Sequence, residues 1–202
     1  MKLYYMAGAC PLATHIVLEW IGQPYEVEAV ARDKLKSPEF LALNPVGSVP
    51  VFTDGDLVLT QSMAILEYLA EKYPEAGLMP ATLEARAETR RWLAFVNADL
   101  HKSFSLVFGK ASFTDDADCQ QQLAAGGSAK ALQLFAILDR QLEGKDWITG
   151  TRSIADPYLY TVMRWARSLK MDLSGFKNLQ AFFERMDADA GVQAAVKAQG
   201  LK

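Results

Sequence analysis

The sequence predicts an α/β domain followed by an all-α domain in a chain of 202 residues. Up to residue 80, short apolar segments of strand composition alternate with amphipathic helices. Beyond residue 80 the strand pattern disappears and only helical periodicity remains. The segment between the two parts, residues 73–80, contains two prolines and a glycine, which favour a linker. We therefore predict one domain over residues 1–80 and a second over residues 81–202.

Composition argues against several classes of partner and compartment. The formal net charge of −3 leaves no basic surface to neutralise phosphates, so no nucleic-acid partner is expected. The two cysteines, Cys10 and Cys119, do not suggest a disulfide framework, which favours a reducing, cytoplasmic location. The apolar run before Cys10 is too short for a secretory signal, and no run of 18 apolar residues predicts a membrane span.

The first strand and helix place Cys10 at a helix N-terminus. Residues 3–6 are apolar and aromatic, as in a buried strand, and a helix over residues 11–21 begins at Pro11 and ends before Gly22. Cys10 is therefore the predicted N-cap, where unpaired N–H groups and the helix dipole favour a thiolate. These neighbouring residues alone favour a reactive thiol and a small buried thiol about equally.

The other elements of the first domain complete a small mixed sheet. A half-buried strand is expected at residues 25–30, and Ser37 opens a short helix at residues 37–43. The remaining elements are a strand at 49–53, a hairpin turn at 54–56, a strand at 57–59 and a helix at 63–72 that Gln61 and Ser62 open. A βαβ unit thus joins a ββα unit, which is the thioredoxin-like plan. In this plan Cys10 lies at the end of the first strand.

The second domain consists of helices only. Its predicted helices cover residues 83–107, 116–142, 157–169, 178–187 and 190–199. The pair Gly126-Gly127 suggests a loosened point within the second of these helices. Ser153-Ile154-Ala155-Asp156 has the form of a capping box before the third.

Three motifs in this order resemble those of cytosolic glutathione transferases. They are Asn44-Pro45-x-Gly47-x-Val49-Pro50, Gln61-Ser62-x-Ala64-Ile65-x-x-Tyr68-Leu69 and the capping box at residues 153–156. The resemblance covers nearly the whole chain, and it implies the fold described above. The bacterial beta class is the most similar, through Gly8-Ala9-Cys10-x-Leu12-Ala13-x-His15-Ile16 and Leu100-His101-Lys102-x-Phe104.

The resemblance implies that glutathione binds as co-substrate and that no metal is needed. Ser62, with Gln61, would receive the γ-glutamyl carboxylate at a helix N-terminus, although Ser62 also suits a plain N-cap. Val49 before Pro50 would pair with the cysteinyl backbone, as an added strand does. Lys34 and Lys36 are both candidates for a basic contact.

Asp99 would meet the glutathione ammonium across the interface of a homodimer, which the resemblance also implies. Asp99 and Lys102 are three residues apart on a helix, so a surface ion pair is the other interpretation.

Three residues are candidates for catalysis through the resemblance. Cys10 would hydrogen-bond the glutathione thiolate or form a mixed disulfide with glutathione, and His101 would donate to either sulfur. Tyr5 is the competing catalyst, as in other transferase classes. Ala13 stands where a second cysteine would be needed, so redox chemistry would use Cys10 alone. We assign His15 a structural role and expect Cys119 to be exposed.

The expected activity is conjugation of glutathione to small hydrophobic electrophiles, with disulfide exchange or peroxidase activity through Cys10. The electrophile pocket would lie between the domains. Its candidate residues are Ala7, Gly8, Phe104, Phe108, Trp165 and Phe113. A dehalogenase-type relative is a second enzyme hypothesis, and a non-catalytic glutathione-binding or interaction module is the third.

Overall fold

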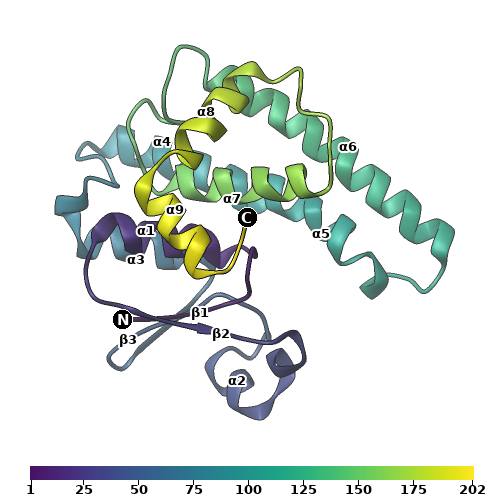
Figure 1. The fold of residues 1–202 in the computed structure, drawn as a ribbon, viewed down its shortest axis with the longest axis horizontal. Coiled ribbons are helices and arrows are strands. Elements are labelled where there is room, and N and C mark those ends of the chain that lie inside the picture. Colours follow the sequence, from purple (N-terminus) through teal and green to yellow (C-terminus); the bar gives the residue numbers. More distant parts are fainter.

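The computed structural model describes residues 1–202 as a four-stranded sheet covered by helices and followed by a helical bundle. Figure 1 shows the sheet at the bottom of the view and the helical part above it. The strands are β1 (Lys2–Tyr5), β2 (Glu26–Ala29), β3 (Val51–Asp54) and β4 (Leu57–Thr60). The helices of this part are α1 (Pro11–Ile21), α2 (Pro38–Leu43) and α3 (Ser62–Lys72). The thioredoxin-like order of elements is confirmed.

The sheet has the strand order β2-β1-β3-β4. β1 pairs in parallel with β2 and antiparallel with β3, and β3 pairs antiparallel with β4. The β1–β2 pair is parallel because α1 carries the chain back across the sheet between them. The β3–β4 hairpin closes at Gly55, whose φ of 59° suits a glycine. β2 was expected to be half-buried, but all four of its residues are exposed because it is an edge strand.

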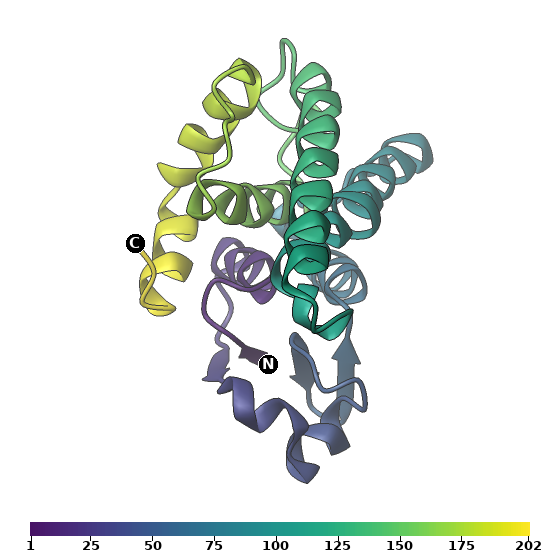
Figure 2. The ribbon, with the colours of Figure 1, turned by 90° about the vertical axis from the view of Figure 1, so that its right-hand side faces the viewer.

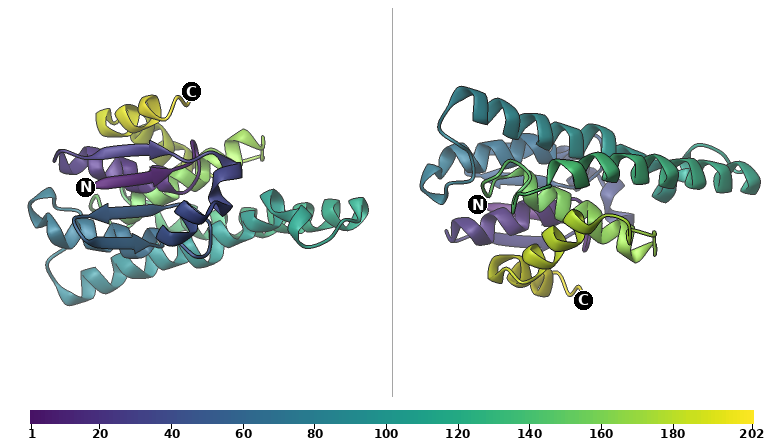
Figure 3. Two further views of the ribbon diagram at one scale, coloured as in Figure 1. Left: turned by 90° about the horizontal axis from the view of Figure 1, so that it is seen from below. Right: turned by 90° about the horizontal axis from the view of Figure 1, so that it is seen from above.

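The helical part contains six α-helices with one irregular segment. They are α4 (Leu83–Ala94), α5 (Lys102–Phe108), α6 (Ala117–Gln141), α7 (Ala155–Ser168), α8 (Lys177–Asp187) and α9 (Ala190–Ala198). The short helical turns η1 (Arg32–Lys36), η2 (Pro74–Ala76) and η4 (Lys110–Ser112) lie in connections. α6 packs against α5, and Figure 3 shows that it extends well beyond the sheet. No helix of this bundle is both long and apolar enough to cross a membrane.

The predicted helix over residues 83–107 is interrupted in the structure. Between α4 and α5 the chain forms a π-helical segment, η3 (Phe95–His101), although the three pieces continue along one axis. A π-helical turn holds an extra residue, so the apolar positions no longer follow a period of 3.6. The helical segment from α4 to α5 therefore keeps its direction. The side chains of Asn97 and His101 point in directions about the helix axis that differ from those in a regular α-helix.

α6 is continuous, and the expected loosening at Gly126-Gly127 is wrong. Gly127 is buried where α6 meets α5, and a Cβ there would lie 2.6 Å from the Ser103 carbonyl oxygen. The glycine is needed because the two backbones approach closely at this position. Asp116 is the N-cap of this helix, and its side chain accepts the backbone N–H of Cys119.

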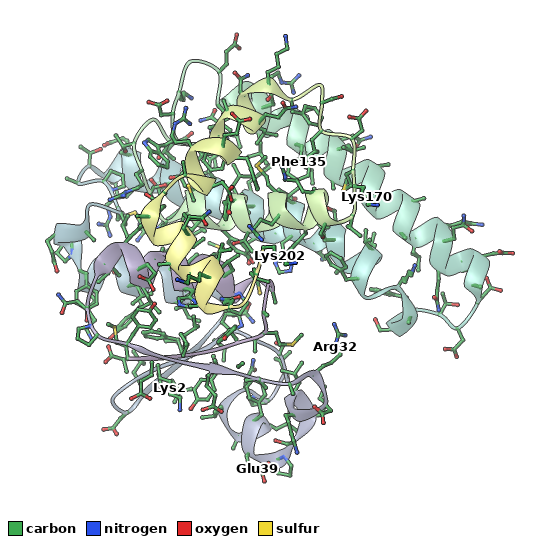
Figure 4. The ribbon with its side chains drawn as sticks, in the orientation of Figure 1. Lys2, Arg32, Glu39, Phe135, Lys170 and Lys202 are labelled. Carbon is green, nitrogen blue, oxygen red and sulfur yellow. The ribbon has the colours of Figure 1, made fainter.

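The two parts share one apolar core. α1 packs against α3 on the sheet side and against α7 and α9 on the helical side. Figure 2 shows α9 beside α1. Leu201, near the end of the chain, lies against Gly8 in the turn that precedes α1. Figure 4 shows Phe135, which is fully buried, among the helices, and Lys2 and Glu39 at the outer edge of the sheet part. α1 therefore packs against both the sheet part and the bundle.

The capping box at residues 153–156 forms in the interior. Asp156 is fully buried and accepts the backbone N–H groups of Ile148 and Ser153, at 2.9 and 2.7 Å, and the Ser153 hydroxyl at 3.1 Å. Burial raises the pKa of Asp156 to about 6. These hydrogen bonds hold the connector before α7 against the start of that helix, which places the rest of α7 over the site described next.

Candidate active site

A cavity of about 280 Å³ lies where the sheet part meets η3 and α7. The turn before α1, the loop before β3 and the start of α3 form one wall. The π-helical segment and α7 form the other. Its lining residues are Cys10, Asn44, Ser48, Val49, Pro50, Gln61, Ser62, Asn97, His101 and Tyr158.

Cys10 is the N-cap of α1, as predicted, with Pro11 at the first helical position. Its thiol lies 3.7 Å from the Val49 carbonyl oxygen and donates a weak hydrogen bond to it. Burial raises the pKa of the Cys10 thiol to about 11, although a hydrogen bond with Ser62 opposes this. In the free protein burial therefore outweighs the helix N-terminus, and the expected thiolate is a protonated thiol at neutral pH.

The loop before β3 presents its backbone to Cys10. The Val49–Pro50 peptide bond is cis. Asn44 shapes the loop because its side chain donates to the Ser48 carbonyl at 2.6 Å and accepts the Val46 N–H at 3.1 Å. The Val49 carbonyl is therefore held toward the cavity by hydrogen bonds within the loop.

The start of α3 forms the polar end of the cavity. Ser62 is the first residue of α3 and is only 4% exposed, although it lines the cavity. Gln61 precedes it with a φ of 70°, a conformation that residues other than glycine rarely adopt. Free N–H groups at a helix N-terminus attract anions, so this end of the cavity suits a carboxylate.

The other wall contains a hydrogen-bonded group of three side chains. The Tyr158 hydroxyl donates to Asn97 Oδ1 at 2.8 Å. The Tyr158 hydroxyl oxygen also lies 2.7 Å from His101 Nδ1. Burial lowers the pKa of His101 to about 4, so the imidazole is neutral. Asn97 and Tyr158 were not predicted as site residues. Asn97 is four positions before His101, and that spacing was the available signal.

Aromatic side chains continue from His101 toward the outside. The Trp165 ring lies 4.7 Å from the His101 ring and 6.0 Å from the Phe108 ring, between ring centres. Phe104 is buried beneath them, whereas Phe108 is 55% exposed. Of the six residues expected in the electrophile pocket, these three form one cluster beside the cavity.

Gly8 is hydrogen-bonded to Trp165 of this aromatic cluster, whereas Ala7 and Phe113 lie apart from it. Trp165 Nε1 donates to the Gly8 carbonyl at 2.7 Å. Ala7 is exposed in the turn. Phe113 lines a separate surface groove together with Cys119, which is exposed as expected.

Lys34 and Lys36 point to different places. Lys36 Nζ donates to the Val46 carbonyl at 2.8 Å and so lies against the loop that bears Val49. Lys34 lines a separate hollow with Tyr4 and Phe40.

Tyr5 and Asp99 lie outside the cavity. The Tyr5 side chain is buried, with its ring centre 6.1 Å from that of His15. Asp99 is exposed on η3 and makes no ion pair with Lys102 or with any other residue.

His15 connects the Cys10 turn to the C-terminal residues. Gln199 accepts the Gly8 N–H at 3.1 Å and donates to His15 Nδ1 at 3.1 Å. His15 Nε2 lies 3.0 Å from the Tyr25 hydroxyl, which in turn donates to Glu19. Every buried partner of His15 is thus a structural one, in agreement with the role assigned to it.

The domain models of one protein family cover almost the whole chain. The glutathione S-transferase N-terminal domain matches residues 1–71, and the glutathione S-transferase C-terminal domain matches residues 62–189. This chain belongs to the glutathione S-transferase family. The thiol cavity between the sheet part and the bundle is accordingly the candidate active site of a glutathione transferase.

Full-length relatives agree with this assignment. The transferase is 45% identical to glutathione S-transferase GST-4.5 of Xanthomonas campestris pv. campestris, with all of both chains covered. It superposes on a glutathione S-transferase from Xylella fastidiosa with a TM-score of 0.95 and 44% identity, over 100% of this chain and 99% of the other.

Two further structures bear on the ligand and the class. A sphingomonad glutathione S-transferase complexed with glutathione is 33% identical, with a TM-score of 0.89 and both chains fully covered. A bacterial beta class glutathione S-transferase from Sphingomonas chungbukensis is 32% identical, with a TM-score of 0.88 and both chains fully covered. The predicted likeness to the bacterial beta class is confirmed.

Proposed function

We propose that this transferase binds glutathione in the Cys10 cavity and joins its sulfur to small hydrophobic electrophiles. The observation that supports this most directly is the cavity itself, which is lined by a thiol, a loop backbone and a helix N-terminus. These are the partners that a cysteine-containing peptide with a terminal carboxylate requires. The proposed activity follows from membership of the family. The proposed orientation of glutathione follows from the residues that line the cavity.

Glutathione would lie with its γ-glutamyl carboxylate at Ser62 and Gln61. Its cysteinyl backbone would pair with Val49, and its sulfur would then lie near Cys10 and His101. Of the two lysines, we propose Lys36 as the basic contact, because it already lies against the loop before β3. Asp99 would reach the ammonium of a glutathione bound to a second copy in a homodimer, since it is exposed and lies outside this chain's own cavity.

The electrophile would lie against Phe108 and Trp165. Their rings border His101, and Phe108 is accessible from outside. An apolar electrophile placed there would approach a sulfur held beside His101.

The proposal also includes the division into a domain at residues 1–80 and a domain at residues 81–202, and a cytoplasmic location.

Binding and turnover are tested together. Purified protein should bind immobilised glutathione and conjugate it to 1-chloro-2,4-dinitrobenzene. If it binds glutathione but turns over no electrophile and no disulfide, a non-catalytic binding module would replace this proposal. Preference for a halogenated substrate, with release of halide, would favour the dehalogenase-type relative.

Cys10 is tested by its own variant. We expect mass spectrometry to detect a mixed disulfide with glutathione in the wild type. Cys10→Ala should abolish both this adduct and glutathione-dependent disulfide exchange. Cys119→Ala is the matched control, because Cys119 is exposed and outside the cavity. Full disulfide-exchange activity in Cys10→Ala would contradict the role of Cys10.

A further inference from the structure

We infer that Tyr158 holds His101 as the Nδ1–H tautomer, so that Nε2 serves as the proton acceptor for the thiol in the cavity. The catalytic part of this inference rests on the proposed function, whereas the tautomer does not. It reverses the sequence-based expectation that His101 donates a hydrogen bond to sulfur.

The Tyr158 hydroxyl determines the tautomer because it has only one proton to donate. That proton is directed to Asn97 Oδ1, at 2.8 Å. The Tyr158 oxygen lies 2.7 Å from His101 Nδ1, and it can therefore only accept a hydrogen bond from that nitrogen. Nδ1 must carry the imidazole proton for this contact to be a hydrogen bond, and Tyr158 is thus a positioning residue for His101.

The second ring nitrogen, Nε2, is the free one. A neutral imidazole carries a single proton, so Nε2 is an acceptor once Nδ1–H is fixed. Nε2 of His101 has no hydrogen-bond partner within the protein. The only buried side-chain N or O atom without a partner is Thr14 Oγ1, so Nε2 is not buried and a ligand can reach it. His101 lines the same cavity as Cys10. In this inference an incoming thiol therefore meets Nε2, the nitrogen that accepts.

The resulting step is a proton transfer. The S–H bond of glutathione breaks, its electron pair stays on sulfur, and the proton forms a bond to His101 Nε2. The products are a thiolate and an imidazolium, whose Nδ1–H still points to the Tyr158 oxygen. Burial disfavours an isolated imidazolium here, but a thiolate beside it provides the compensating charge.

His15 provides an internal comparison, because its hydrogen bonds require the opposite tautomer. Gln199 donates its amide N–H to His15 Nδ1, and the Tyr25 hydroxyl donates to Glu19. The Tyr25 oxygen therefore accepts from His15 Nε2. The chain contains two histidines only, and the structure assigns one tautomer to each.

Nitrogen-15 NMR of the free protein at neutral pH tests the tautomers directly. Two-bond nitrogen–proton correlations should show His101 as Nδ1–H and His15 as Nε2–H. Tyr158→Phe should shift His101 toward Nε2–H and leave His15 unchanged. Tyr25→Phe is the control and should change neither tautomer, because the Gln199 amide still donates to His15 Nδ1. An Nε2–H signal from His101 in the wild type would overturn the inference, as would a His101 signal that is unaffected by Tyr158→Phe.

Kinetics test the catalytic part. Tyr158→Phe should lower kcat for conjugation by roughly 10²-fold with little change in KM for glutathione, since a positioned base contributes on this scale. Tyr25→Phe should leave kcat unchanged. If Tyr158→Phe changes the tautomer but not kcat, His101 is not the acceptor. If the wild type shows the assigned tautomers but conjugates no electrophile, the proposed function fails and the tautomer assignment stands.

Discussion

Gln61 holds an unfavourable backbone conformation at the edge of the cavity. Its φ of 70° costs about 1–3 kcal/mol in a residue with a Cβ, and such residues concentrate at binding sites. The geometry directs the chain into α3 with Ser62 facing the cavity. Strain at this residue is therefore part of how the anion-binding end is built.

Substitutions at Gln61 should separate strain from binding. Gln61→Gly should be more stable than Gln61→Ala by about 1 kcal/mol, because glycine adopts a positive φ without steric cost. Both variants lose the Gln61 side chain and should bind glutathione more weakly than the wild type. Urea denaturation and glutathione titration measure the two effects. Equal stability of the glycine and alanine variants would show that the conformation relaxes in solution.

His101 should make folding stability depend on pH. Its pKa is about 4 in the folded protein and 6.5 as the reference value, so only the unfolded chain takes up the proton between these values. The stabilisation is complete above pH 6.5 and is lost as the pH falls toward 4. At about 1.4 kcal/mol per unit, the loss amounts to about 3 kcal/mol.

The measurement is the free energy of unfolding at pH 7 and at pH 4 to 5 for wild type and His101→Asn. The variant should lose less stability than the wild type over this range. The slope that remains in the variant reports His15, whose pKa burial also lowers, together with the carboxyl groups. Identical slopes for the two proteins would contradict a depressed pKa at His101.

At the scale of elements, the contact between α5 and α6 depends on one glycine of an adjacent pair. Gly127→Ala places a Cβ 2.6 Å from the Ser103 carbonyl oxygen and should lower the free energy of unfolding by about 1–3 kcal/mol. Gly126→Ala meets nothing within 4 Å and should raise it by about 0.5–1 kcal/mol, because alanine favours helix. Thermal denaturation of both variants checks the contrast, and effects of the same sign would refute this packing.

The π-helical segment shows where helix periodicity stops being a sufficient guide. The long rod from α4 to α5 was expected from its apolar positions, and its direction and extent are correct. The extra residue within η3 is not encoded in that period, and η3 packs against α7. Asn97, His101 and Tyr158 are brought together by this irregularity, which explains why only His101 was predicted.

At the scale of the whole molecule, the helical part clamps the turn that bears Cys10. Gly8 is bound at its N–H by Gln199 and at its carbonyl by Trp165, and both partners lie more than 150 positions away in the sequence. Leu201 also lies beside Gly8, 3.5 Å from where a Cβ would be. The reactive turn of the sheet part is thus held by residues from α7 and the chain's last residues.

Removing this clamp should destabilise the whole protein. Gln199→Ala leaves the Gly8 N–H and His15 Nδ1 without partners and should cost about 1–3 kcal/mol. Gln193→Ala, on the exposed side of α9, should change stability by less than about 0.5 kcal/mol. Denaturant unfolding compares the two, and equal effects would show that Gln199 does not connect the parts.

Local sequence patterns determined the order of the elements, the N-cap position of Cys10 and the family. Capping residues, prolines and apolar periods act over a few positions, so the sequence displays them directly. Only the tertiary structure decided the state of the chemistry at Cys10 and His101. Burial raises the pKa of one and lowers that of the other, and Tyr158, 57 positions from His101, sets its tautomer. Desolvation and long-range hydrogen bonds arise from packing, and no pattern of neighbouring residues contains them.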